Sequence, residues 1–220
     1  NPTGRAISAT ELERLAEVCR ETHTWLMLDE CFQWFLDTRR ECSFVGNLLN
    51  GVGYHVILLN ALTKICSMAG LRLGYGIIPN AGLRERLEKF RQPWSVSAPA
   101  QAGGVAAFAV LADHSEGNLL EWTVKSLQTE RPRLAEKLEE LGFIVYPSQT
   151  NYLLFRSSDE DSRDYKQGCL EHGILIRACE NFEGLNRHYY RVAVRNRGEN
   201  ESLINILKEV QSEEKHNVNL

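Results

Sequence analysis

The sequence predicts an α/β fold with a mostly parallel sheet and flanking helices, followed by a smaller α+β part. Two apolar runs, Trp25–Leu28 and His55–Leu59, show no alternation of apolar and polar residues, which is typical of strands buried on both faces of a parallel sheet. Segments with apolar residues at helical spacing accompany these runs. After Gly142 the predicted elements become shorter, which indicates a second, smaller part.

The first helix is predicted over residues 9–21. The capping-box pattern Ser8 to Glu11 precedes a series of apolar residues at helical spacing, and such a box marks the start of a helix. A third strand is predicted over residues 73–78, because a Pro-Asn pair directly follows that apolar run and such residues end strands.

Three further helices are predicted before the elements shorten. Residues 83–90 show helical spacing up to Pro93, residues 98–111 are rich in Ala and Gly and suit a closely packed helix, and residues 117–141 carry a long helical pattern. Pro132 lies inside the last pattern, and we expect it to kink or split that helix.

The last part of the chain is predicted to be a mixture of short elements. The sequence places strands near 143–146, 151–156, 174–178 and 189–195, and helices near 160–171 and 199–212. We therefore expect two domains, with residues 1–112 as part of a large domain and residues 113–220 as a small C-terminal domain.

Length and charge narrow the class of protein. With 220 residues the chain can bury one large core or two smaller ones. Its net charge of -4 argues against nucleic acid as a partner, because nucleic-acid binders present a basic face. No run reaches the roughly eighteen apolar residues that a membrane span needs. The sequence therefore predicts a cytoplasmic protein without a nucleic-acid or membrane partner.

The cysteines and histidines give no sign of a metal site. The six cysteines lack paired C-x-x-C spacing, and the six histidines lack ligand-like spacing. Most of the cysteines lie inside apolar segments, so we expect reduced thiols in the core of the protein.

Polar residues of opposite charge follow two of the predicted strands. Asp29 ends the first strand, and Lys64 lies in a short turn after the second. In open α/β sheets, ligands bind outside the carboxyl ends of the strands. From the residues alone, this pair forms either a ligand site or a plain salt bridge.

Four motifs in a fixed order give this pair a context. The chain carries N-P-T-G at residues 1–4, then Asp29, then the Thr63-Lys64 turn, then Arg72 in the run AGLRLGY. This series resembles the signature of fold-type I pyridoxal-phosphate enzymes, the aminotransferase superfamily. The resemblance implies pyridoxal 5'-phosphate (PLP) as the cofactor. It also implies that the first part of the chain is the C-terminal part of the PLP-transferase large domain.

The resemblance implies a role for each of these residues. Lys64 is the covalent anchor of the cofactor and moves a proton at the substrate carbon. Asp29 keeps the pyridine nitrogen protonated, and Arg72 binds the phosphate through its planar fork. Asn1 donates to the ring oxygen, and Thr63 is a further cofactor contact.

Two positions depart from the pattern of the family. Phe32 stands three residues after Asp29, where the family commonly has a tyrosine that donates to the ring oxygen. Ala61 stands three residues before Lys64, where a serine or threonine often touches the phosphate. We therefore expect phosphate binding to be weaker, or to depend on residues outside this chain.

The second part of the chain resembles one branch of the superfamily. Residues 174–185 contain the turn N-F-x-G-L, and residues 190–195 contain R-V-A-V-R. Both resemble the small domain of histidinol-phosphate aminotransferase and, more closely, threonine-phosphate decarboxylase of cobalamin biosynthesis. The resemblance implies that Arg191 binds the substrate carboxylate and that Arg177 is a second cationic contact. The alternative for each arginine is a structural ion pair.

These resemblances imply a PLP-dependent enzyme for an amino acid or amino-phosphate substrate, with threonine-phosphate decarboxylase as the first interpretation. The alternatives are an aminotransferase of the histidinol-phosphate type and the cofactor-sensing domain of a transcription regulator. The family builds its sites across a twofold contact, so we expect the full-length protein to be a homodimer. The chain starts at Asn1, and we expect a fragment that lacks its N-terminal part and is a poor catalyst by itself.

Overall fold

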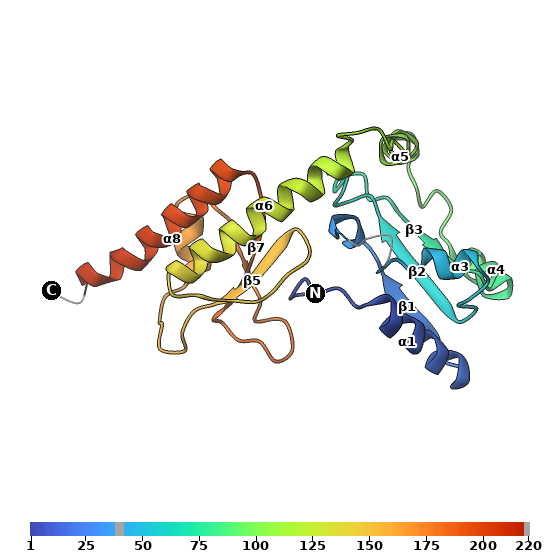
Figure 1. Cartoon of the computed structure of the whole chain (residues 1–220), viewed down its shortest axis with the longest axis horizontal. Coiled ribbons are helices and arrows are strands. Elements are labelled where there is room, and N and C mark those ends of the chain that lie inside the picture. The colour runs from blue at the N-terminus through green and yellow to red at the C-terminus, as the bar shows by residue number, and fades with distance from the viewer. Residues whose placement is uncertain (38–41, 218–220) are drawn as a thin grey trace. The chain divides into compact units, whose positions relative to one another are not determined.

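The computed structural model describes residues 1–37 and 42–217, the last five of them by their backbone only. The chain divides into two compact units (Figure 1). The first unit is Ala6–Trp122, and the second unit is Asn1–Arg5 together with Thr123–Leu220. The division falls in the first turn of helix α6 (Leu119–Glu140). The domain boundary between residues 112 and 113 stays a prediction.

A three-stranded sheet forms the centre of the first unit. Its order is β1-β2-β3, with the strands at Leu26–Asp29, Val56–Ala61 and Gly74–Ile77. β1 and β2 are parallel, whereas β2 and β3 are antiparallel. The α/β class is confirmed, but the pairing in this sheet is mixed instead of mostly parallel. Residues 62–73 join β2 directly to β3 without a helix between them, whereas parallel neighbours are usually joined through a helix.

β1 lies at an edge of this sheet, and it is covered on one face only among the described residues, which corrects the expectation that it is buried on both faces. Leu26 and Leu28 pack against the core, whereas Met27 is 62% exposed and Asp29 is exposed. Successive side chains of a strand point to opposite faces. Among the described residues, only one face of β1 is covered, so its apolar sequence does not reflect double burial.

The core of the first unit lies on one face of the sheet. Helices α1 (Ala9–Glu21) and α3 (Val45–Leu49) pack on that face. The buried residues of this core are Leu12, Ala16, Phe44, Leu48, Val56 and Leu58. Each fully buried leucine contributes about 1.5–3 kcal/mol, so this cluster fixes the strands whose ends carry the predicted site.

α1 begins and ends where the sequence predicts. Ser8 Oγ accepts from the Glu11 N–H at 3.3 Å, and Glu11 Oε2 accepts from the Ser8 N–H at 3.0 Å. The two side chains therefore satisfy two N–H groups that the helix itself leaves without partners. The sequence did not predict α3 or the 3₁₀ turn η1 (Gln33–Phe35), because elements this short show no periodic pattern.

Two helices follow β3, close to their predicted ranges. They are α4 (Ala81–Phe90) and α5 (Ala98–Leu111). α5 packs tightly on the end of the loop between β2 and β3, since a Cβ atom at Gly104 would come within 2.5 Å of the Leu73 side chain. The Ala- and Gly-rich composition is thus explained by close approach, as predicted.

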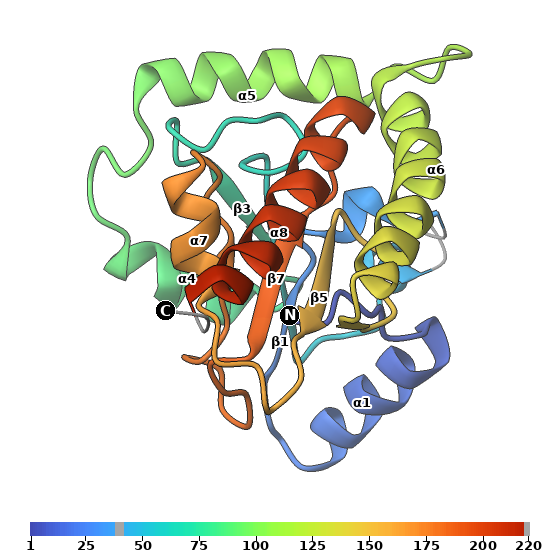
Figure 2. The same ribbon diagram turned by 90° about the vertical axis from the view of Figure 1, so that its left-hand side faces the viewer.

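The second unit is built on a four-stranded antiparallel sheet in the order β4-β5-β7-β6. The strands are β4 (Ile144–Val145), β5 (Tyr152–Arg156), β7 (Tyr189–Ala193) and β6 (Arg177–Ala178). Figures 1 and 2 show α6, α7 (Tyr165–Glu171) and α8 (Arg197–Asn217) on one side of this sheet. The unit is therefore of the predicted α+β type.

The two faces of this second sheet differ in character. Tyr190 packs against the ring of Tyr165 from α7, with 5.8 Å between the ring centres, and Phe155 is fully buried beside it. Side chains alternate along a strand, so Arg156 and Arg191 belong to the opposite face. The helices cover the apolar face, and arginines occupy the other.

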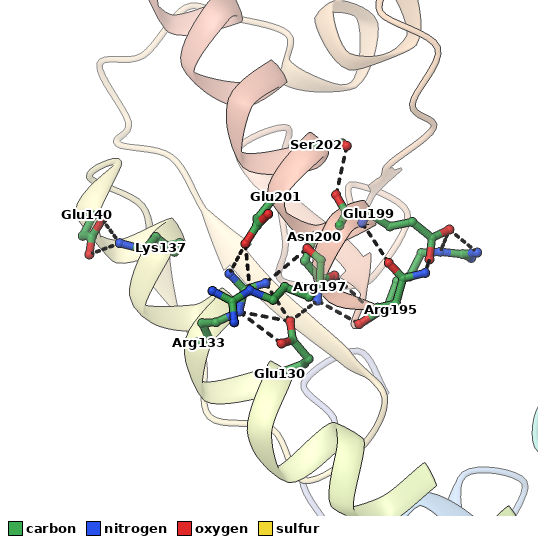
Figure 3. A network of polar contacts seen from close by, with 12 residues as sticks. Glu130, Arg133, Lys137, Glu140, Arg195, Arg197, Glu199, Asn200, Glu201 and Ser202 are labelled. Atoms are coloured by element: carbon green, nitrogen blue, oxygen red, sulfur yellow. Dashed lines mark hydrogen bonds and ion pairs between the residues drawn. The ribbon is translucent and has the colours of Figure 1, made fainter. Parts of the chain in front are cut away.

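α6 runs through Pro132 as one helix, so the predicted split does not occur. A polar network joins α6 to the start of α8 (Figure 3). Glu130 accepts from Arg133 at 2.7 Å and from Asn200 Nδ2 at 2.9 Å, and Arg133 pairs with Glu201 at 3.3 Å. These contacts fix the beginning of α8 on α6.

Candidate functional site

Asp29 is the last residue of β1, at the carboxyl end of the first sheet. Its Oδ1 accepts from the backbone N–H of Cys31 at 2.9 Å, and the Cys31 thiol also hydrogen-bonds to this carboxylate. The side chain lies on the face away from the core and is exposed. The turn after β1 therefore orients a carboxylate that remains open to a ligand.

Lys64 and Arg72 lie near the two ends of the loop that joins β2 to β3. The loop closes on itself, because the Leu62 N–H donates to the Leu73 carbonyl at 3.3 Å. Arg72 has a left-handed backbone with a φ of 53° and donates to a carbonyl of the same loop at 3.1 Å. Both cations are exposed. The closed loop thus holds them at the same end of the sheet as Asp29.

The thiol of Cys31 lies within the electrostatic influence of both predicted charges. Burial, above all, raises the pKa of this thiol to about 12, Asp29 raises it as well, and the ammonium group of Lys64 lowers it. Lys64 Nζ lies 6.0 Å from the centre of the Phe32 ring. Among the described residues, no salt bridge joins Asp29 to Lys64. The sequence left open that Asp29 and Lys64 form a plain ion pair, and among the described residues they do not.

Arg191 and Arg177 face each other across strands β7 and β6 of the second unit. The guanidinium of Arg191 lies 4.7 Å from the centre of the Tyr152 ring and donates to Asn1 Oδ1 at 2.5 Å. Arg177 donates to Asn181 Oδ1 at 3.1 Å. Neither arginine has a carboxylate partner within the part of the chain that the structure describes. Adjacent guanidinium groups with neutral partners are suited to binding an anion.

The predicted site residues form two groups, one in each unit. The strand ends and the loop of the first unit bring together Asp29, Thr63, Lys64 and Arg72. The N-terminal segment and strands β6 and β7 of the second unit bring together Asn1, Arg177 and Arg191.

Sequence reasoning missed two side chains of these groups. Cys31 donates hydrogen bonds to the carboxylate of Asp29. Its position between Asp29 and Phe32 in the sequence was the only sign that it belongs to this group. Tyr152 supports the guanidinium of Arg191. Its position on a strand was predicted, but the pairing of that strand with β7 was not.

The described residues contain no cluster of metal-binding side chains beside these two groups. No group of three or more His, Cys, Asp or Glu among them could hold a metal ion. The six cysteines are thiols outside any disulfide, with Cys169 and Cys179 buried and the other four partly buried. No helix in the described part of the chain is both long and apolar enough to cross a membrane.

The sequence matches the protein family described as aminotransferase class I and II over residues 1–207. A similar curated protein is the threonine-phosphate decarboxylase of Salmonella typhimurium. It is 35% identical over 211 residues, which make up 96% of this chain and 55% of that protein. The chain therefore spans about half the length of the curated relatives that it matches.

Two solved structures extend this similarity to the fold. The histidinol-phosphate aminotransferase of Clostridium acetobutylicum superposes with a TM-score of 0.84 at 28% identity, covering 96% of this chain and 61% of that one. The histidinol-phosphate aminotransferase of Sinorhizobium meliloti, solved with pyridoxal-5'-phosphate, gives a TM-score of 0.76 at 25% identity and covers 96% of this chain and 54% of that one.

Proposed function

The chain belongs to the aminotransferase class I and II family, and on this premise we propose that it is part of a PLP-dependent enzyme for an amino acid or amino-phosphate substrate. One observation supports this most: the first sheet ends in an oriented carboxylate, beside a loop with an exposed amine and a guanidinium group. We propose decarboxylation of the threonine-phosphate type as the reaction.

The residues at the strand ends fit the chemical groups of the cofactor. An aldehyde needs an amine outside any ion pair, a pyridine nitrogen needs a carboxylate, and a phosphate needs a cation with directed donors. Lys64, Asp29 and Arg72 offer these three groups at one end of one sheet. When bound, the cofactor supplies an electron sink for the bond that breaks at the substrate α-carbon.

Lys64 is the proposed covalent anchor and the group that moves the proton at the α-carbon. Its amine is exposed and forms no ion pair with any residue that the structure describes, so it is available as a nucleophile and as a base. Its described aromatic neighbour is Phe32, at 6.0 Å. The phenyl ring offers no hydrogen bond, so this neighbour leaves the amine uncommitted.

Asp29 is proposed to hold the proton on the pyridine nitrogen. Its carboxylate takes the Cys31 N–H at 2.9 Å, which restricts its rotation and leaves lone pairs for a ligand. Arg72 is proposed to bind the phosphate, with Thr63 beside Lys64 as a further contact. Asn1 accepts from Arg191 through Oδ1, so its Nδ2 is the group proposed to donate to the ring oxygen.

Arg191 and Arg177 are proposed to bind the anionic groups of the substrate. Arg191 is half-buried and pairs with no carboxylate among the described residues. Leaving the charge of such a guanidinium without a counter-charge is costly, which supports a functional role for Arg191. Its ring contact with Tyr152 and its bond to Asn1 restrict its orientation. A restricted guanidinium can fix the direction of a bound carboxylate.

That direction decides between decarboxylation and transamination. The arginines would hold the carboxylate in one orientation, and this orientation would decide which bond at the α-carbon the electron sink of the cofactor weakens. The 35% identity to the decarboxylase of Salmonella typhimurium favours loss of the carboxylate. The second candidate is an aminotransferase of the histidinol-phosphate type, favoured by the TM-score of 0.84 to the enzyme of Clostridium acetobutylicum.

The biological setting belongs to the same proposal. We propose a cytoplasmic homodimer that acts in cobalamin biosynthesis, with residues 1–112 in the large domain and 113–220 in the small one. The support is the resemblance of the N-F-x-G-L and R-V-A-V-R motifs to threonine-phosphate decarboxylase. The family builds its sites across a twofold contact.

The test uses the full-length protein. After incubation with the cofactor and reduction with borohydride, peptide mass spectrometry is expected to find the cofactor mass on Lys64, and to find it nowhere in Lys64→Ala. Cofactor attached to another lysine, or to none, contradicts the proposal. Carbon dioxide released from L-threonine O-phosphate supports the decarboxylase. Glutamate formed from histidinol phosphate and 2-oxoglutarate selects the aminotransferase instead, and turnover of neither substrate contradicts both.

A further inference from the structure

A cavity of about 680 Å³ lies within the first unit, on the core face of its sheet. This face is opposite to the one that carries Asp29. The cavity is bordered by Asn60, Tyr75 and Ile77 from the strands and by Phe108 and Leu111 from α5. Its volume falls in the range of about 300–1,000 Å³ that is typical of small-molecule sites. No residue of the proposed cofactor site lines it.

The most buried charged group in the cavity wall is the carboxylate of Glu30. This residue is 7% exposed, and it accepts from the Phe44 N–H at 2.7 Å and from the Ser43 hydroxyl at 2.8 Å. Both donors are neutral. Burial raises the pKa of Glu30, and the bonds from Phe44 and Ser43 offset this only in part. Each carboxylate oxygen keeps a further lone pair for a ligand.

The remaining wall is acidic, polar and aromatic. Glu121 also borders the cavity, whereas no lysine or arginine does so within the described part of the chain. Trp34, Tyr75 and Phe108 supply aromatic rings. The Trp34 indole is fixed by its bond to Asn60 Oδ1 at 3.0 Å, and the rings of Tyr75 and Phe108 lie 5.5 Å apart. Aromatic faces attract organic cations as well as apolar groups.

We propose that this cavity binds an organic cation: a small apolar body that carries one protonated amidine, guanidine or amine group, paired with the carboxylate of Glu30. The apolar body lies against the aromatic rings, and the cationic group gives Glu30 the partner that its neighbours do not provide. Binding of an anion of the same shape is disfavoured, because it would face the carboxylates of Glu30 and Glu121, and the described lining contains His114 but no lysine or arginine. The inference does not depend on the proposed cofactor or reaction.

The test compares three probes of nearly equal shape and different charge. Isothermal titration calorimetry at neutral pH measures binding of benzamidine (a cation), benzamide (neutral) and benzoate (an anion) to the protein. A bond from a charged donor contributes about 1.5–3 kcal/mol, so benzamidine is expected to bind at least about tenfold more tightly than benzamide. Equal binding of the two, or no binding of benzamidine, overturns the proposal.

Glu30→Gln is the direct variant. The new side chain keeps an oxygen for the Phe44 N–H and an NH₂ group that can bond to Ser43, so the local structure can be retained. Benzamidine is expected to lose about tenfold in affinity or more, and benzamide to lose little. Unchanged benzamidine binding in Glu30→Gln overturns the proposal. Glu85→Gln removes an equal charge from the exposed surface of α4 and is expected to bind benzamidine like the parent protein.

A second variant tests the cavity without changing its charge. A Cβ atom at Gly46, which borders the cavity, meets no atom within 4 Å, so Gly46→Leu places a larger side chain there without a clash at Cβ. Benzamidine binding is expected to fall at least about tenfold while Glu30 is intact. Full binding by Gly46→Leu places the probe elsewhere and overturns the assignment. The benzamidine-to-benzamide ratio of the parent protein tests the proposal even if a variant fails to fold.

Discussion

Removing the charge of Glu130 should destabilise the second unit far more than removing a matching charge elsewhere on α6. The side chain of Glu130 is 14% exposed, and its carboxylate accepts hydrogen bonds from Arg133 at 2.7 Å and from Asn200 at 2.9 Å. Glu140 also forms an i,i+3 pair on α6, with Lys137 at 2.6 Å, but it is 50% exposed. Figure 3 shows both pairs, and only that of Glu130 reaches α8.

The contacts set the expected size of the effect. A hydrogen bond to a charged group contributes about 1.5–3 kcal/mol and a neutral one about 0.5–1.5 kcal/mol. Glu130→Gln removes the negative charge from both bonds, so the bond from Asn200 becomes neutral and the bond from Arg133 keeps only the charge of its donor. The variant should therefore lower the free energy of unfolding by about 2 kcal/mol. Exposed pairs contribute about 0.2–1 kcal/mol, so Glu140→Gln should cost less than half as much.

The assay is urea unfolding of both variants, followed by far-ultraviolet circular dichroism. With a slope of about 2 kcal/mol per molar urea, Glu130→Gln should lower the midpoint by about 1 M. All four tryptophans lie in the first unit, so their fluorescence reports whether that unit is unaffected. Hydrogen exchange should increase in peptides from the start of α8. Equal midpoints for Glu130→Gln and Glu140→Gln would refute the reasoning.

The same network predicts a dependence on pH. The hydrogen bond from Arg133 is the main cause that lowers the pKa of Glu130. A carboxylate with a lowered folded-state pKa stabilises the fold above its unfolded-state pKa. That contribution is lost as the pH falls through the folded-state value. The difference in midpoint between the parent protein and Glu130→Gln should therefore shrink in acid.

Three further predictions concern the two site groups. Arg191→Lys should lower kcat/KM of the full-length enzyme by about tenfold to a hundredfold, mainly by raising KM, because a point charge replaces two directed donors. The control is Arg195→Lys, at an exposed arginine paired with Glu199, which should change kcat/KM little. Gly4→Ala should lower the free energy of unfolding of the second unit by about 1–3 kcal/mol in urea unfolding. Gly4 has a φ of +76°, and a Cβ atom there would lie 2.3 Å from Ser148 Oγ. An unchanged urea midpoint would contradict this prediction. Burial, with a smaller contribution from Asp29, raises the pKa of Cys31 to about 12, so this thiol should react with iodoacetamide at pH 8 about a thousandfold more slowly than an unperturbed thiol. Alkylation at the rate of free cysteine would contradict the burial of this thiol beside Asp29.

Local signals in the sequence predicted most of the elements. The capping box set the start of α1, and the Ala- and Gly-rich run set α5, because both depend on neighbours along the chain. The prediction that β1 is buried on both faces was wrong, because an apolar run does not show which face of the strand is covered. The antiparallel return of β3 was also not predicted, because pairing direction depends on the loop and not on the strand pattern.

In the candidate site, too, the sequence identified residues that are close along the chain and missed contacts between distant ones. Lys64 and Arg72 lie on one short loop, so a motif could identify them together. The bond between Arg191 and Asn1 joins residues that are 190 positions apart, and no local pattern contains such a contact. Glu30 follows Asp29 directly, yet the sequence could not show that it turns into the core and borders a cavity.

The parallel register of β1 on β2 pairs Asp29 with Leu59. It sends two consecutive acids to opposite sides of the sheet, one toward open space and one toward Phe44. A slip of one residue would exchange their places, leaving the core with the shorter acid and the strand end with the longer one. The leucines that lock this register therefore determine, at a distance, which acid is available for chemistry.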